Sequence, residues 1–220
     1  MRTAIYLAST APLCDNARFA RLLETVPAAR REKVLRYKNA AAARLSLGAG
    51  LLLNAALTDA GLRADGLGET EYGKPWFPAH PDFHFNLSHS GEAVMCAVSG
   101  AAVGCDLEAP GRACDLKLAD RFFHPEEKRW LRSLPTEEQA DAFFRLWTCK
   151  ESFVKALGLG LSQPLDSFSV QLAGPVRLCQ SVDPRPWRLR SFHDGAYICA
   201  LCGLEGVEDA PVRRVDFYIM

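Results

Sequence analysis

The sequence predicts an α/β protein of the α+β kind, built from two similar halves. In the first half, residues 28–57 are patterned as a long helix, and alternating apolar and polar residues at 83–99 predict strands. The second half repeats this order, with a helical pattern over residues 141–157 followed by strand patterns at 168–172 and 189–201. Identity between the halves is too low to prove an internal repeat, so they are similar in pattern rather than in sequence.

Length and composition fit a globular protein with this organisation. The chain has 220 residues, of which 49% are hydrophobic, so it can bury a substantial core as one large domain or two small ones. We place the boundary near residues 109–114, which gives an N-terminal half at 1–110 and a C-terminal half at 111–220. The formal net charge is zero, which argues against general nucleic-acid binding.

The eight cysteines predict a reduced, cytoplasmic protein rather than a disulfide framework. Their spacing is irregular and no export signal is evident. Cys199 and Cys202 form a C-x-x-C pattern, but they lie in a predicted strand, where positions i and i+3 face opposite ways. The apolar stretch at 40–57 contains Arg44 and Asn54, so we expect a helix of a soluble protein and no membrane span.

Two acidic residues two positions apart, Asp106 and Glu108, follow the apolar residues 103–105. An extended backbone points residues i and i+2 to the same face, so the two carboxylates project together. Adjacent carboxylates repel each other, and Mg²⁺ relieves that repulsion because it prefers oxygen ligands from one or two carboxylates and from phosphates. The alternative is that both acids lie at a solvated strand end. The prediction of a metal site therefore depends on a third acid elsewhere in the sequence.

Glu151 is the candidate for that third acid, and it lies in the predicted helix at 141–157. Lys155 is four residues further on, so a helix places both side chains on one face, either as a surface ion pair or as a base and a cation beside a phosphate. Lys150 falls within the apolar stripe of the helix, where it either reaches out to solvent or lies in a groove between the halves. Gly158 follows as the expected left-handed residue at the C-terminus.

Residues 83–91 predict a half-buried strand that runs into a small polar turn. Ser88, His89 and Ser90 gather hydroxyl groups and an imidazole there, which suits phosphate oxygens. A hairpin turn that binds no ligand is the alternative. The G-x-S-x-G pattern of a hydrolase nucleophile elbow does not occur in the sequence.

Together these segments resemble the 4′-phosphopantetheinyl transferases, of the larger type that activates surfactin synthetase. The matching motifs are NLSHS at 86–90, VGCDLE at 103–108 and WTCKESFVK at 147–155, in the order and spacing of the family. EYGKP at 71–75, and Arg121-Phe122-Phe123 with Glu127, are also similar to family segments. The resemblance spans residues 30–168. Cys105 departs from the branched aliphatic residue that is common at its position, but cysteine is also a small hydrophobic residue.

This resemblance implies a fold and an activity. The fold would be a pseudo-dimer of two similar halves, each a long helix packed on a small antiparallel sheet. The N-terminal half would bind the phosphates of coenzyme A, and the C-terminal half would carry the catalytic helix and the docking site for a carrier protein. The activity would be transfer of 4′-phosphopantetheine from coenzyme A to a serine of an apo acyl carrier or peptidyl carrier protein, with release of 3′,5′-ADP.

The resemblance also implies residue roles. Asp106, Glu108 and Glu151 would bind Mg²⁺, which Mn²⁺ can replace, and Asp106, Glu151 and Lys155 would be catalytic, with Glu151 as a base that deprotonates the serine. Coenzyme A would be held by Arg30, Lys33, Arg44, Lys74, Pro75, Asn86, Ser88, His89, Lys150 and Lys155. Within this set, Arg30, Lys33 and Arg44 would lie near the 3′-phosphate, although a run of basic residues is also what a solvated helix face shows.

Two other functions stay open at the level of sequence. One is a Mg²⁺-dependent phosphohydrolase that uses the same three acids on another pyrophosphate. The other is a non-catalytic module that binds carrier proteins. We expect a monomer, because a chain that contains two halves has less need to assemble.

Overall fold

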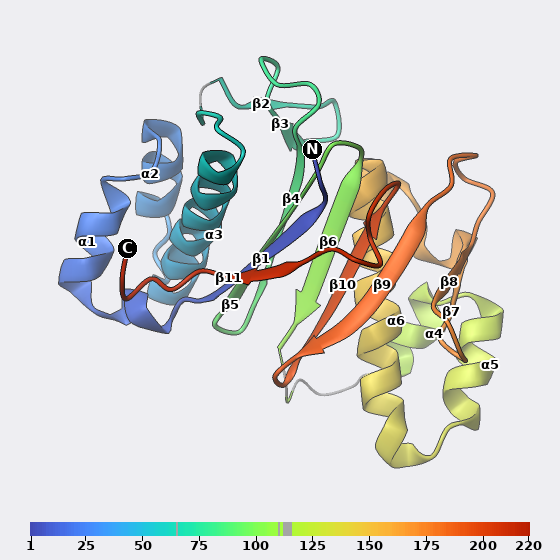
Figure 1. Cartoon of the computed structure of the whole chain (residues 1–220). Coiled ribbons are helices and arrows are strands. Elements are labelled where there is room, and N and C mark those ends of the chain that lie inside the picture. The colour runs from blue at the N-terminus through green and yellow to red at the C-terminus, as the bar shows by residue number, and fades with distance from the viewer. Residues whose placement is uncertain (65, 110, 112–115) are drawn as a thin grey trace.

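The computed structural model describes residues 1–64, 66–109, 111 and 116–220. Most of the predicted boundary at 109–114 therefore lies outside the described residues, and the division into halves stays a prediction there. Figure 1 shows two long helices, α3 and α6, each lying beside its own group of strands. This arrangement confirms the α+β fold with two similar halves, each a long helix on a small sheet.

The first sheet has four strands in the order β11-β1-β5-β4. These are β1 (Ala4–Ser9), β4 (His84–Ser90), β5 (Ala93–Ser99) and β11 (Val212–Arg214). Strands β1, β5 and β4 pair antiparallel, whereas β11 pairs parallel to β1. The parallel strand comes from the C-terminal end of the chain, and the sequence analysis did not identify it.

Helices cover one face of this sheet. They are the short 3-10 helix η1 (Ala11–Cys14), α1 (Asn16–Leu23), α2 (Ala28–Leu35) and α3 (Ala40–Asp59), and the small hairpin of β2 (Gly68–Glu69) and β3 (Pro75–Trp76) follows them. The prediction of one helix over 28–57 is wrong, because two helices form there. Asn39 separates them, since its side chain accepts hydrogen bonds from the backbone N–H groups of Ala41 and Ala42 and so caps α3.

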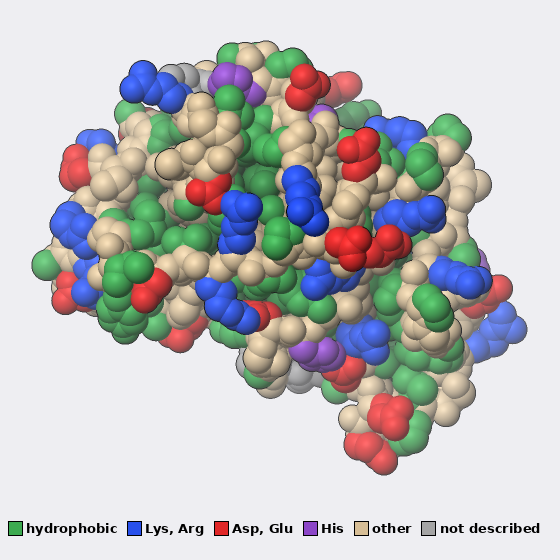
Figure 2. Space-filling view, in the orientation of Figure 1, with side chains coloured by type: hydrophobic (Ala, Val, Ile, Leu, Met, Phe, Trp, Pro, Cys, Tyr) green, Lys and Arg blue, Asp and Glu red, His purple; other side chains and the backbone are tan. Residues whose placement is uncertain are grey.

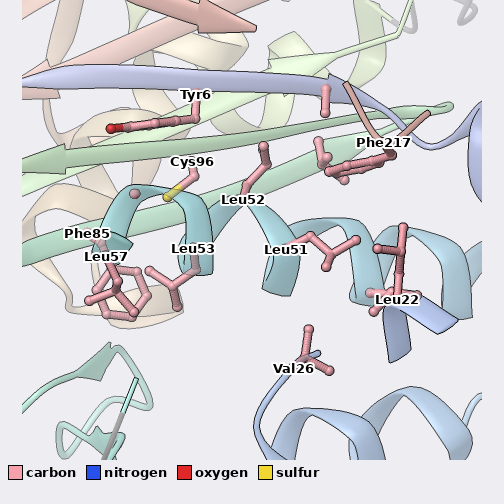
Figure 3. Close-up of a cluster of buried hydrophobic side chains, with 14 of the residues drawn as sticks. Tyr6, Leu22, Val26, Leu51, Leu52, Leu53, Leu57, Phe85, Cys96 and Phe217 are labelled. Carbon is pink, nitrogen blue, oxygen red and sulfur yellow. The ribbon is translucent and has the colours of Figure 1, made fainter. Parts of the chain in front are cut away.

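The apolar face of α3 forms the N-terminal core. Figure 3 shows Leu52 and Leu53 of α3 beside Cys96 of β5, with Phe217 from the C-terminal tail near the same helix. By length and composition alone α3 could cross a membrane, but 56% of its most apolar window is buried inside the fold. A core helix of a soluble protein has this property as well.

The second sheet has three antiparallel strands in the order β6-β10-β9. They are β6 (Val103–Glu108), β9 (Arg188–Asp194) and β10 (Tyr197–Gly203), and α6 (Thr136–Leu157) packs on them. The other elements of this half are α4 (Leu116–Phe122), α5 (Pro125–Ser133), η2 (Gly160–Ser162), η3 (Leu165–Ser167) and the pair β7 (Ser169–Gln171) and β8 (Arg177–Cys179). Helix α6 contacts the sheet as well as α5 and β7. Each sheet contains one strand from the other side of the predicted boundary. Strand β6 precedes the boundary but belongs to the second sheet, and β11 follows it but belongs to the first.

Within the described residues, five cysteines are buried and two are exposed. All seven cysteines within the described residues are free, and Cys199 and Cys202 pack in different apolar clusters, as expected for opposite faces of a strand. Figure 2 shows acidic and basic side chains interspersed over the face in view, consistent with the zero net charge.

Gly104 allows α6 to lie directly on β6. A Cβ atom at this position would lie 2.1 Å from the Ser152 carbonyl oxygen and 2.3 Å from the Ala156 nitrogen. Both atoms belong to the helix backbone, so a side chain could be accommodated only if the whole helix moved. Gly104 lies on the same face of β6 as Asp106 and Glu108, so this close packing also sets how near α6 comes to the two acids.

We expect Gly104→Ala to lower the free energy of unfolding by about 3 kcal/mol or more, at the upper end for overpacked cores. Urea unfolding followed by circular dichroism measures the loss. Gly203→Ala is the matched control, because Gly203 pairs with Val103 on the next strand and the nearest atom to its Cβ would be in the Val207 side chain, at 3.1 Å, with the nearest backbone atom at 3.4 Å. Equal stability of the Gly104→Ala protein and the wild type would contradict the close-packing argument.

Candidate active site

The two halves meet along β4 and β6, where side-chain hydrogen bonds cross between the sheets. Alternate residues of β4 point to the same side, so Asn86, Ser88 and Ser90 all face β6. The bonds are Cys105 N–H to Asn86 Oδ1 (2.8 Å), Ser88 O–H to Asp106 Oδ1 (2.7 Å) and Ser90 O–H to Glu108 Oε2 (2.8 Å). This seam brings the predicted acids of β6 and the predicted hydroxyl groups of β4 into contact.

Lys155 of α6 contacts residues of both β4 and β6 at this seam. Its Nζ lies 2.6 Å from Asp106 Oδ1 and 3.2 Å from Ser88 Oγ. Burial alone would lower the pKa of Lys155, but the charge of Asp106 and the hydrogen bond to it raise the pKa overall. Burial raises the pKa of Asp106, while Lys155 and Ser88 oppose that shift. The result is a largely buried ion pair at the junction of the two halves.

Glu151 lies one helical turn before Lys155 and is partly buried. Burial raises the pKa of its carboxyl group, and the charges of Asp106 and Glu108 raise it further, while Lys155 opposes them. The three predicted acids therefore interact electrostatically in one region. A raised pKa suits a residue that must accept a proton near neutral pH.

The acids fit a divalent cation by chemistry, although they do not form a ready-made ligand set. In the part of the chain that the structure describes, no three His, Cys, Asp or Glu side chains are arranged closely enough to hold a metal ion. One observation favours a cation: Asp106 Oδ2 is buried and has no hydrogen-bond partner. A buried carboxylate oxygen without a partner is costly, and Mg²⁺ together with ligand oxygens would satisfy it.

His89 follows Ser88 in β4 and is influenced by charges from both halves. The residue is exposed at the end of β4, and partial burial lowers the pKa of its imidazole, with Lys155 and Lys33 contributing in the same direction and Asp106 opposing. The charges of Lys155 in α6 and Lys33 in α2 thus both disfavour the protonated form of His89. A bound phosphate would reverse the shift, because a nearby negative charge favours the protonated ring.

Arg30 and Arg44 are partly buried and Lys33 is exposed. The aliphatic part of Arg30 crosses α3 at Gly50, where a Cβ would lie 2.9 Å from Arg30 Cγ. Burial lowers the pKa of Arg30, and Tyr37 partly offsets that effect. Among the described residues, none of the three basic side chains makes a salt bridge to a carboxylate, so all three are available to an anion.

Three residues expected to bind coenzyme A have hydrogen-bond partners within the protein. Lys150 is 0% exposed, so neither a position at the solvent nor one in a groove between the halves is correct. Asn86 is buried and bonds the Cys105 backbone. Lys74 Nζ donates to the carbonyl oxygens of Val103 (3.0 Å), Lys155 (2.7 Å) and Ala156 (3.1 Å), and burial lowers its pKa to about 8. These three acceptors match the three N–H groups of an ammonium ion, so Lys74 joins the hairpin of the N-terminal half to β6 and α6.

Pro75 lies in β3 and lines a cavity of about 230 Å³ between the β3–β4 region and the end of α6. From the sequence, Ser90 was expected only near phosphate oxygens and Gly104 had no site role, although both shape the acidic site. Ser90 could have been found, because it lies two residues after Ser88 and so shares its face of the strand.

Comparisons with known proteins show the family of this chain. The family model described as the 4′-phosphopantetheinyl transferase superfamily matches residues 102–202. A 4′-phosphopantetheinyl transferase of Bacillus subtilis is 42% identical over 188 residues, which covers 83% of this chain and 84% of that protein. The transferase Sfp of Bacillus subtilis strain 168 is 40% identical over 135 residues, 60% of each chain. The crystal structure of a holo-(acyl-carrier-protein) synthase from Bacillus anthracis in complex with CoA (3′,5′-ADP) has a TM-score of 0.43 and 20% identity, over 48% of this chain and 96% of that one.

This chain belongs to the 4′-phosphopantetheinyl transferase family, and within it to the larger type that activates surfactin synthetase. It is an enzyme that transfers 4′-phosphopantetheine from coenzyme A to a carrier protein.

Proposed function

We propose that the transfer takes place at the β4–β6–α6 seam, with Mg²⁺ as the metal and the serine of an acyl carrier or peptidyl carrier protein as the acceptor. The observation that carries this proposal is the contact of Lys155 with Asp106, next to Glu108 and Glu151. A cation beside clustered acids suits a pyrophosphate whose bridging bond must break. Catalysis of this kind depends on positioning and on neutralising charge.

In the proposed step, the serine oxygen forms a bond to the phosphorus of the phosphopantetheine phosphate. The bond from that phosphorus to the bridging oxygen breaks, and 3′,5′-ADP leaves with the electron pair. Glu151 accepts the serine proton, while Lys155 stabilises the charge that develops on the pyrophosphate. Asp106, Glu108 and Glu151 would hold Mg²⁺, which would neutralise phosphate charge.

Coenzyme A would be oriented from the N-terminal half. Ser88 lies beside Lys155, and Ser88 and His89 would contact the pyrophosphate. Arg30, Lys33 and Arg44 would contact the 3′-phosphate, for which their lack of carboxylate partners within the described residues makes them available. A cytoplasmic location and a monomeric state complete the proposal.

The test is to incubate the protein with coenzyme A, Mg²⁺ and a panel of apo carrier proteins from fatty-acid, polyketide and peptide synthesis. Intact-mass analysis should show one phosphopantetheinyl group added to the serine of an accepted carrier. Release of 3′,5′-ADP should require both carrier and Mg²⁺. Release without a carrier would instead support the phosphohydrolase, and binding of a carrier without modification would support the non-catalytic module.

Arg44→Ala tests the proposed 3′-phosphate contact. A charge-assisted hydrogen bond contributes roughly 1.5–3 kcal/mol, so kcat/KM for coenzyme A should fall about tenfold or more. The value for dephospho-coenzyme A should change much less, because that donor lacks the phosphate. Arg36→Ala is the control, since Arg36 is exposed and pairs with Glu32. Equal losses with both donors would show that Arg44 contacts something other than the 3′-phosphate.

A further inference from the structure

Lys150 directly precedes Glu151 in α6, yet its side chain lies fully inside the C-terminal half. Its Nζ donates to Glu127 Oε1 and to the Phe168 carbonyl oxygen, each at 2.7 Å. The Phe168 ring centroid lies 4.3 Å from the same nitrogen. Lys150 is therefore surrounded by protein atoms and cannot contact a substrate in solution.

Glu127 joins three elements through one carboxylate. Besides Lys150 of α6, its Oε1 accepts the Val170 N–H of β7 at 2.6 Å. Its Oε2 accepts the His124 N–H at 2.8 Å, as part of the capping box that starts α5. The carboxylate is almost fully buried, and the bonds to Lys150, Val170 and His124 satisfy both of its oxygens.

A buried ion pair of this kind is a poor source of stability. The cost of removing both charges from water is large, and apolar residues of similar size are often as stable or more stable. The pair instead restricts the Lys150 side chain to one position, because an ammonium group displaced from Glu127 would enter an apolar environment of aromatic and aliphatic side chains. On another side of the same helix, Gly104 fixes the distance from α6 to β6. The position of α6 is thus set by backbone contact with Gly104 on one side and by the Glu127–Lys150 ion pair on another.

We propose that the Glu127–Lys150 pair is a positioning device for the transfer reaction, which fixes the rotation of α6 about its axis. Successive helical residues are about 100° apart, so a rotation that moves Lys150 moves Glu151 equally. The pair thereby holds Glu151 and Lys155 toward Asp106. This inference rests on the proposed function, and it assigns to Lys150 and Glu127 a role through Glu151 rather than a contact with coenzyme A.

The test compares Lys150→Met with the double variant Glu127→Gln/Lys150→Met. The single variant leaves the Glu127 charge buried without its cation, so its thermal midpoint should fall well below that of the wild type. The double variant removes both charges and keeps an amide oxygen for the Val170 N–H, so much of the stability should return. The kcat per folded molecule should stay about 30-fold or more below wild type in both, because a misplacement near 1 Å costs up to about 10²-fold.

Binding measurements separate positioning from the other roles. By calorimetry, the affinity of the double variant for coenzyme A should stay within about threefold of wild type, while the Mg²⁺ concentration for half-maximal rate rises. Recovery of kcat together with stability would overturn the proposal and leave a purely structural ion pair. A loss of coenzyme A affinity as large as the loss of kcat would also overturn it, in favour of direct substrate contact.

Two further variants keep the test decisive. Leu189→Ala removes a buried side chain from the same apolar cluster and should lower the thermal midpoint without lowering kcat per folded molecule. If the double variant does not fold, Lys150→Arg serves in its place, since a guanidinium keeps the charge but cannot occupy the space of an ammonium without moving α6. Wild-type kcat in a folded Lys150→Arg protein would overturn the proposal. Failure of the wild type to modify any carrier would instead refute the proposed function.

Discussion

Asp106→Ala is expected to reduce transfer by about 10³-fold or more at ordinary Mg²⁺ concentrations, in the upper range for the loss of one charged active-site group. Asp106 Oδ1 holds Lys155 and Ser88 together, and its Oδ2 is the buried oxygen without a partner. Alanine removes both oxygens, so Lys155 loses the carboxylate that orients it and the proposed metal loses a ligand. High Mg²⁺ or Mn²⁺ should restore part of the activity, because the metal site is weakened rather than removed.

The measurement is the rate of carrier modification by intact mass, with circular dichroism to confirm the fold. Asp59→Ala is a matched control, since Asp59 also accepts from a hydroxyl group, that of Tyr6, and from a cation, Arg213, at the far end of α3. Asp59→Ala should transfer at nearly the wild-type rate. Full activity of Asp106→Ala in the presence of EDTA would refute the role of Asp106 in both charge neutralisation and metal binding.

The sequence predicted those parts of the fold and site that depend on local pattern. The long apolar helices and the period-2 placement of Asp106 and Glu108 are properties of a few neighbouring residues, and the structure contains them. The spacing of the hydroxyl groups could also have predicted which acids they bond. Ser88 and Ser90 are two positions apart, as are the acids, and each serine donates to the acid 18 residues further on.

The parts that were missed depend on partners that are distant in the chain. Lys150 looked like a misplaced surface residue because its partner, Glu127, lies 23 residues earlier and is positioned by the start of α5. The sequence also gave no sign that three carbonyl oxygens at the β6–α6 junction accept hydrogen bonds from Lys74. Strand β11 is short and mostly exposed, so its hydrophobic pattern gave no signal. Residue type alone does not distinguish a structural cation from one that binds a ligand.

Glu151→Gln is expected to leave coenzyme A binding nearly unchanged while turnover falls by about 10²–10⁴-fold, the range of a general base. Glutamine keeps an oxygen that can bind a metal but cannot accept the serine proton. The pKa of Glu151 is raised above its ordinary value of 4.5 by burial and by the neighbouring acids. Because the base acts in its deprotonated form, the wild-type rate should fall as pH decreases through that raised pKa. The rate of the variant should not show this decrease.

Calorimetry of coenzyme A binding and single-turnover transfer across pH separate the two roles of Glu151. Glu138→Gln is the control, because Glu138 is an exposed acid in the first turn of the same helix and should behave as wild type. If binding falls as much as rate, Glu151 acts as a metal ligand alone, and the serine proton must pass to another acceptor. A wild-type pH profile with a uniformly lower rate would lead to the same conclusion, because the acid limb would then belong to another group.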